Sequence, residues 1–193
     1  MPIDHLFPTP IYYADAPGET REKILCEFMG KKDLISQTLE QDTWGDNIST
    51  TFHKENLIVE HRLESLSQFV VQSVCDFCDL LFKKQIKIFM DSSWVNYQGL
   101  HQFQERHNHI PSLISGVYYL KADGDEGDLR IFKPSDAMYE SDFAGGAYAN
   151  APVSYKPTEG RIIIFPGWVP HGVMYNKTDK TRISVTFNFK EAY

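Results

Sequence analysis

The hydrophobic positions follow two different periods along the chain, and the change falls near residue 86. Before it, apolar residues recur at helical spacing over residues 19–30 and 31–41, and most strongly from 55 to 84, where one helix or two are expected. Residues 6–14 carry two prolines inside an apolar segment, which is typical of a short edge strand. Helices should therefore form most of the N-terminal part.

After residue 86 the apolar segments become short and rich in β-branched and aromatic residues, and turn residues separate them. We expect strands over residues 86–90, 92–97, 115–121, 128–132, 161–165 and 182–189. Two stretches are expected to be loops, namely the polar residues 44–52 and the Gly-, Ala-, Tyr- and Ser-rich residues 134–157. A loop as long as the second is more often functional than accidental.

Helices followed by short strands indicate an α+β domain or a β-sandwich decorated with helices. A chain of 193 residues with 42% hydrophobic and 23% charged residues suits one globular domain, and no internal repeat divides it. We therefore expect a single domain over residues 1–193, with a helical support region over about 1–85 and a β core over about 86–193.

Charge and cysteine content limit the partners and the compartment. The net charge of −7 and the lack of a basic run argue against binding nucleic acid through its phosphates. No apolar run approaches the roughly 20 residues that span a membrane, and the N-terminus does not resemble a signal peptide. Three cysteines do not indicate a disulfide framework, so a cytoplasmic location is expected. Cys75 and Cys78 are spaced as C-x-x-C, but they lie in the helical pattern and are interpreted as packing residues.

Three histidines have the layout of a facial iron site. His107 and His109 are separated by one position, which places both side chains on one face if the backbone there is a strand. His171 comes from a segment remote in sequence, like the second histidine of the usual site of two histidines and one carboxylate. His109 stands where that site has its carboxylate. The other four histidines are assigned no function.

An arginine lies on a predicted strand shortly after the third histidine. The alternation of this strand puts Arg182, Ser184, Thr186 and Asn188 on one face and apolar residues on the other. An arginine fork with a hydroxyl group two residues away suits the distal carboxylate of a dicarboxylic acid. The same segment therefore indicates a carboxylate site beside the histidines.

These residues stand in motifs that resemble a known family. The motifs are Phe7-Pro-Thr-Pro, Ser93-Trp-Val-Asn, His107-Asn-His, Ser115-Gly-Val-Tyr-Tyr-Leu, Phe165-Pro-Gly-Trp-Val-Pro-His-Gly-Val and Arg182-Ile-Ser-Val-Thr-Phe-Asn-Phe. Together they are similar to the 2OG-Fe(II) oxygenase family of small bacterial and phage proteins that carry H-x-H. A wider likeness to prolyl 4-hydroxylases is also visible, and the resemblance covers nearly the whole chain.

The resemblance implies a mainly β fold with N-terminal helices, namely a double-stranded β-helix (the jelly roll of the cupins). It implies a 2-oxoglutarate/Fe(II)-dependent dioxygenase, an oxidoreductase that requires Fe(II), 2-oxoglutarate and O2. Such an enzyme hydroxylates a peptide side chain or a small molecule and releases succinate and CO2. The catalytic metal ligands would be His107, His109 and His171.

The resemblance also assigns the co-substrate site. Arg182, helped by Ser184, would bind the distal carboxylate of 2-oxoglutarate, Tyr119 would donate a hydrogen bond to the same group, and Tyr97 would line the co-substrate pocket. Independently of the resemblance, the long loop over residues 134–157 is interpreted as a lid over the substrate.

The chain departs from the wider superfamily at His109, where an aspartate is usual. An imidazole there makes the metal centre more positive by one unit, and it either ligates the metal or leaves that position to water. The acidic residues between 123 and 128 look like turn residues of a hairpin and are not expected to take the ligand role.

Two other functions stay open at this point. A three-histidine cupin dioxygenase would need no 2-oxoglutarate, although Arg182 with Ser184 argues against it. A non-catalytic β-sandwich module with a structural zinc would normally need a fourth protein ligand, and no convincing one is present. A homodimer is a further expectation, because the predicted edge strand at residues 6–14 can pair with a second copy.

Overall fold

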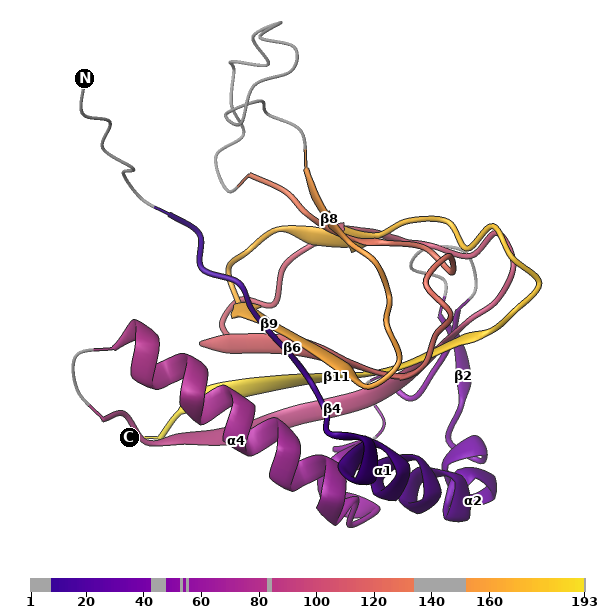
Figure 1. Cartoon of the computed structure of the whole chain (residues 1–193), viewed down its shortest axis with the longest axis horizontal. Helices are drawn as coiled ribbons and strands as arrows, with labels where there is room; N and C mark the ends of the chain where they lie inside the picture. The colour runs from indigo at the N-terminus through magenta and orange to yellow at the C-terminus, as the bar shows by residue number, and fades with distance from the viewer. Residues whose placement is uncertain are drawn as a thin grey trace, which may run out of the picture.

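The computed structural model describes residues 8–42, 48–52, 54, 56–82, 85–133 and 152–192, and these form two antiparallel sheets with helices on one side (Figure 1). The larger sheet has seven strands, in the order β1 (Tyr12–Asp15), β9 (Arg161–Pro166), β6 (Ile114–Lys121), β11 (Arg182–Glu191), β4 (Ile88–Gln98), β3 (Ile48–Thr50) and β2 (Glu40–Asp42). The smaller sheet has four strands, in the order β5 (Gln104–His107), β10 (His171–Val173), β7 (Leu129–Ile131) and β8 (Val153–Tyr155).

The helices cover the outer face of the larger sheet. They are α1 (Gly18–Gly30), α2 (Lys32–Ser36), α3 (Leu57–Glu60) and α4 (Glu64–Leu81). In Figure 1, α4 lies across this face and the smaller sheet lies on the opposite side. A first apolar core forms here, where Val74 and Phe77 of α4 pack with the sheet residues Tyr118, Val185 and Phe187.

A second apolar cluster lies between the two sheets. It joins Tyr119 of β6, Ile163 and Phe165 of β9, and Leu129 and Val173 of the smaller sheet. Along each central strand, alternate residues therefore belong to different clusters, as the two-residue period of a strand requires. This alternation fixes which side chains can reach the space between the sheets.

The structure agrees with the predicted helices in kind and corrects some boundaries. The long helical pattern is two helices, α3 and α4, and Arg62 between them has a positive φ of 48°. The strands expected at 86–90 and 92–97 are one continuous strand, β4. Residues 48–50 were expected in a loop but form the strand β3, which pairs with β4. The strand is too short for its hydrophobic period to show in the sequence.

The predicted edge strand and cysteines have the expected roles with one exception. β1 pairs on one side with β9 and stands at the end of its sheet. Cys78 packs in the first core, and burial raises the pKa of its thiol to about 11. Cys75 lies on the solvent-facing side of α4 and is exposed. The prediction that it packs in the core is therefore wrong.

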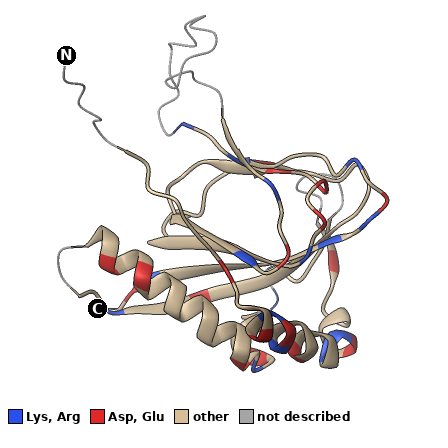
Figure 2. Ribbon diagram, in the orientation of Figure 1, with Lys and Arg blue, Asp and Glu red and all other residues tan. Residues whose placement is uncertain are grey.

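Charged residues are distributed without a dominant sign on the first helices. Figure 2 shows acidic and basic residues interspersed along α1 and α2. Among the described residues, no helix is long and apolar enough to cross a membrane. The loop expected at 134–157 lies outside the described residues up to position 151, and its last residues include β8.

Candidate metal centre and carboxylate site

Two of the three histidines are placed by the smaller sheet. His107 is the last residue of β5 and His171 is the first residue of β10, and the two are direct partners in the strand register. His109 lies just beyond the end of β5. Of the two histidines that were expected on one strand, only His107 is therefore part of it. Its backbone is held instead by a hydrogen bond from its N–H to the carbonyl oxygen of Gly167, at 2.8 Å.

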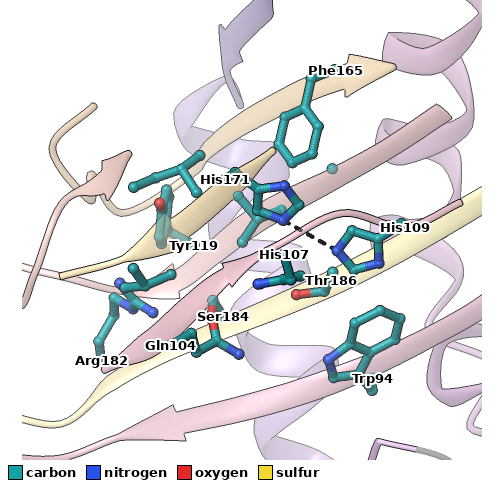
Figure 3. Close-up of a pocket in the computed structure, with 14 residues that line it drawn as sticks. Trp94, Gln104, His107, His109, Tyr119, Phe165, His171, Arg182, Ser184 and Thr186 are labelled. Atoms are coloured by element: carbon teal, nitrogen blue, oxygen red, sulfur yellow. Dashed lines mark hydrogen bonds between the residues drawn. The ribbon is translucent and has the colours of Figure 1, made fainter. Parts of the chain in front are cut away.

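The three imidazole rings converge on one point between the sheets (Figure 3). One ring nitrogen from each of His107, His109 and His171 lies within 4.8 Å of the others. The Nε2 atoms of His109 and His171 are 3.1 Å apart. Two nitrogens bound to one ion at right angles, each at about 2.1 Å, would be separated by about 3 Å. The donor set therefore fits a divalent metal, and three imidazoles suit iron(II) among others.

Backbone carbonyl groups orient two of the rings. The Nδ1 atom of His107 lies 2.7 Å from the carbonyl oxygen of Glu105, and that of His171 lies 2.9 Å from the carbonyl oxygen of Val169. Because a carbonyl oxygen can only accept, Nδ1 carries the proton in each ring and the lone pair is left on Nε2. Both rings thus present the atom that a metal needs.

The third ring is oriented by an aromatic neighbour. The ring centroids of Trp94 and His109 are 5.7 Å apart, and the two ring planes are tilted by 32°. The ring centroid of Phe52 lies 4.8 Å from that of Trp94. Among the described residues no carbonyl group accepts a hydrogen bond from the ring of His109, so this residue is held by packing and by its backbone.

Burial keeps the three imidazoles neutral. Desolvation lowers the pKa of His107, and it lowers that of His171 well below its usual range. The pKa of His109 is lowered to about 3, first by burial and then by the repulsion it would meet from a protonated His107. Neutral imidazole is the form that binds metals, so the site is ready at neutral pH.

Arg182 lies at the other end of the same cavity. It is the first residue of β11 and its side chain is buried. Its guanidinium donates one hydrogen bond to the carbonyl oxygen of Gly127, at 2.9 Å, and another to the side-chain oxygen of Gln98. Burial lowers the pKa of Arg182, but an arginine stays protonated in proteins.

Arg182 forms no ion pair with a carboxylate in the described part of the chain, and the buried carboxylate of Glu126 acts on its charge only from beyond ion-pair distance. Its two hydrogen-bond acceptors, on Gly127 and Gln98, are neutral, and within the described residues its Nε–H group is buried without a partner. A buried charge of this kind is costly unless an anion joins it. The arrangement therefore suits a ligand that brings a carboxylate.

The neighbouring residues divide between the two faces of the sheet. Ser184 and Tyr119 are register partners on β11 and β6, and both line the cavity with Arg182. Burial raises the pKa of Tyr119, so its phenol is protonated and can donate a hydrogen bond. Tyr97 pairs with Ile183 and packs in the helix-facing core, so its assignment to the co-substrate pocket is not retained.

The remaining candidates have structural roles. The carboxylate of Glu126 accepts hydrogen bonds from the N–H groups of Asp123 and Gly124, at 2.9 to 3.0 Å, as expected of a turn residue. Sequence reasoning placed Thr186 on the face of Arg182 but gave it no role in the site, and it missed the cavity residues Trp94, Gln104 and Phe165. For Trp94 and Thr186 the strand alternation was a usable signal, because they share the face of Arg182 and Gln98.

Comparisons with known proteins agree with this geometry. Residues 92–188, half of the chain, match the model of a family described as "Putative 2OG-Fe(II) oxygenase". No curated protein sequence matches the chain.

Solved structures of low sequence identity share the fold. A prolyl-4-hydroxylase of Pseudomonas putida has a TM-score of 0.64 and 15% identity, and the match covers 96% of this chain and 94% of that one. A prolyl hydroxylase of Trichoplax adhaerens, in complex with a hypoxia inducible factor peptide fragment, has a TM-score of 0.67 and 14% identity, with 94% and 83% covered. The non-heme alpha ketoglutarate dependent epimerase SnoN from nogalamycin biosynthesis has a TM-score of 0.68 and 10% identity, with 95% and 79% covered. These likenesses confirm the predicted jelly roll with N-terminal helices.

Proposed function

The chain belongs to the 2OG-Fe(II) oxygenase family, and on that premise we propose that it is a hydroxylase whose metal ligands are His107, His109 and His171. Members of this family are oxidoreductases that use Fe(II), 2-oxoglutarate and O2. In the proposal Arg182, with Ser184 and Tyr119, binds the distal carboxylate of 2-oxoglutarate.

One observation carries the proposal. A single cavity contains three converging imidazoles at one position and, at another, a buried arginine that forms no ion pair with any described carboxylate, and residues from both sheets line it (Figure 3). A dicarboxylic 2-oxo acid suits both positions, because one end can chelate a metal held by the histidines and the other end carries a carboxylate for the arginine. Neither a structural zinc module nor a three-histidine dioxygenase without 2-oxoglutarate needs the second.

The protein residues orient the reactants and keep water away. Two backbone carbonyl groups fix the lone pairs of His107 and His171, and Arg182 fixes the far end of the co-substrate. Val117, Leu129 and other apolar residues line the cavity and limit the access of water. When bound, Fe(II) with O2 and 2-oxoglutarate supplies oxidation of a C–H bond to C–OH, with release of succinate and CO2.

The substrate is proposed as a class. The Trichoplax adhaerens enzyme was solved with a peptide, which makes peptide side chains the first group to test. SnoN belongs to the biosynthesis of nogalamycin, so small molecules are the second group. We expect the protein to act in the cytoplasm and not on nucleic acid or membranes.

The first experiment titrates Fe(II)-loaded protein with 2-oxoglutarate without oxygen and records the visible charge-transfer band of the chelate. We expect the band in the wild type and its loss or a large shift in affinity in Arg182→Ala. The matched control is Arg161→Ala, because Arg161 forms an ion pair with Asp15 on the surface.

Two results would contradict the proposal. If iron binds but no band forms in the wild type, the co-substrate assignment fails and the three-histidine dioxygenase or zinc module is favoured. If the band is equally strong in Arg182→Ala, the carboxylate is bound elsewhere.

A further inference from the structure

Gln98 is a fully buried residue at the end of β4 and lies directly opposite Arg182 in the strand register. Its amide nitrogen donates hydrogen bonds to the carbonyl oxygens of Gln102 and Met174, at 2.6 and 3.0 Å. Because carbonyl oxygens only accept, the side-chain oxygen of Gln98 must be the atom that faces the guanidinium. The backbone therefore fixes the orientation of this amide.

The segment around Gln98 is held by a second buried amide. The side chain of Asn176 donates to the carbonyl oxygens of Gln98 and Lys180, at 3.0 and 2.7 Å. The N–H group of Asn176 donates to the carbonyl oxygen of Gln102, at 3.0 Å. Hydrogen bonds from its own side chain and from Asn176 therefore fix the position of Gln98 beside Arg182. Precise binding sites require that the residues behind the ligand-binding side chains are held in this way.

The residue at position 98 also decides the charge that Arg182 meets. An amide accepts a hydrogen bond from the guanidinium without neutralising it. A carboxylate of the same shape would form a buried ion pair with the arginine and would compete with any anionic ligand. Because the partner at position 98 is neutral, it forms no ion pair with Arg182, and the guanidinium can still pair with the carboxylate of a ligand.

We propose that Gln98 is a positioning and specificity-determining residue of the carboxylate site. It holds the Arg182 guanidinium through a neutral acceptor, so that the site selects a dicarboxylic 2-oxo acid over one with an uncharged tail. This inference rests on the proposed role of Arg182 in binding 2-oxoglutarate.

The test compares two ligands of equal chain length in the Fe(II)-loaded protein without oxygen. 2-Oxoglutarate carries a distal carboxylate, whereas 2-oxopentanoate ends in a methyl group and can form the same chelate. Dissociation constants for both are measured from the charge-transfer band in the wild type and in Gln98→Glu. Gln41→Glu, at an exposed position of β2, is the matched control for the added charge.

We expect Gln98→Glu to weaken 2-oxoglutarate binding by about 30-fold or more, as for other perturbed buried charge pairs, and to leave 2-oxopentanoate binding nearly unchanged. The selectivity of the wild type would then largely disappear. Equal weakening of both ligands would show a merely structural role and overturn the inference, and so would unchanged selectivity.

A glutamate both loses the two donations to the carbonyl groups of Gln102 and Met174 and adds a charge, so Gln98→Met, which loses the same donations without adding a charge, is the second variant. It removes the acceptor of the guanidinium, and we expect 2-oxoglutarate binding to fall while 2-oxopentanoate binding and iron binding stay. Full retention of 2-oxoglutarate affinity in Gln98→Met would overturn the inference. If the wild type itself fails to prefer 2-oxoglutarate, the proposed role of Arg182 fails instead, so the two failures are distinguishable.

Discussion

The two faces of the seven-stranded sheet have opposite characters, although the same strands build both. Toward the helices, Val185 and Phe187 of β11 are fully buried in an apolar core. Toward the smaller sheet, Arg182, Ser184 and Thr186 of the same strand line the cavity. The two-residue period of a strand thus separates residues that stabilise the fold from residues that bind ligands. Substitutions on one face should change stability and those on the other should change binding.

The largest expected effect is on the helix-facing side. Phe187→Ala should lower the free energy of unfolding by about 3–5 kcal/mol, because it removes a buried ring and leaves a cavity. The control is the adjacent Thr186→Ala on the cavity face, with an expected loss of about 1 kcal/mol or less. Urea unfolding followed by circular dichroism measures both, and equal losses would contradict the division between the faces.

The next effect is on metal binding. His171→Ala should lower the affinity for Fe(II) by more than about 100-fold, since loss of a ligand exceeds the 10–100-fold effect of outer contacts. Anaerobic equilibrium dialysis measures it. His101→Asn is the control, because His101 is exposed and has a positive φ that asparagine tolerates. Iron binding at wild-type strength in His171→Ala would place the metal elsewhere.

A smaller effect should follow from moving the loop that carries His109. A Cβ atom added at Gly167 would lie 2.1 Å from the carbonyl oxygen of Ser112, so Gly167→Ala must shift the backbone contact that holds this loop. We expect a drop in Fe(II) affinity of about tenfold. Gly18→Ala meets nothing within 4 Å and should bind iron normally. An unchanged affinity in Gly167→Ala would show that the loop adapts without moving His109.

An effect of similar size is expected at Ser184, on co-substrate binding instead of metal binding. Ser184→Ala should weaken 2-oxoglutarate binding by about tenfold, which corresponds to one hydrogen bond to a charged group. Iron binding and the unfolding free energy should change little. Calorimetric titration without oxygen measures the affinity, and a value equal to that of the wild type would exclude Ser184 from the site.

The fold was predictable where the hydrophobic pattern was long. The helix-facing residues of β11 alternate with polar ones over the whole strand, so its faces could be assigned before the structure was known. β5, β8 and β10 have only three or four residues each, which is too short for a period to appear. These three strands form the smaller sheet together with β7, which lies within the strand expected at 128–132, so only one strand of that sheet was predicted.

The site was predictable by motif more than by pattern. His107, His171 and Arg182 stand in recognisable motifs, and the structure brings them to one cavity. The resemblance placed Tyr97 there as well, and the pattern of β4 could not correct it, because both alternating sets of this strand contain aromatic and polar residues and the sequence does not say which set faces the helices. Gln98 was missed for the same reason, since only the register shows that it lies opposite Arg182.

The most direct test of the account is a crystal structure of the protein with Mn(II) in place of iron and with 2-oxoglutarate. The account predicts anomalous density for the metal among His107, His109 and His171, and the distal carboxylate of 2-oxoglutarate against Arg182. A metal bound away from these histidines, or a co-substrate whose distal carboxylate does not contact Arg182, would contradict it.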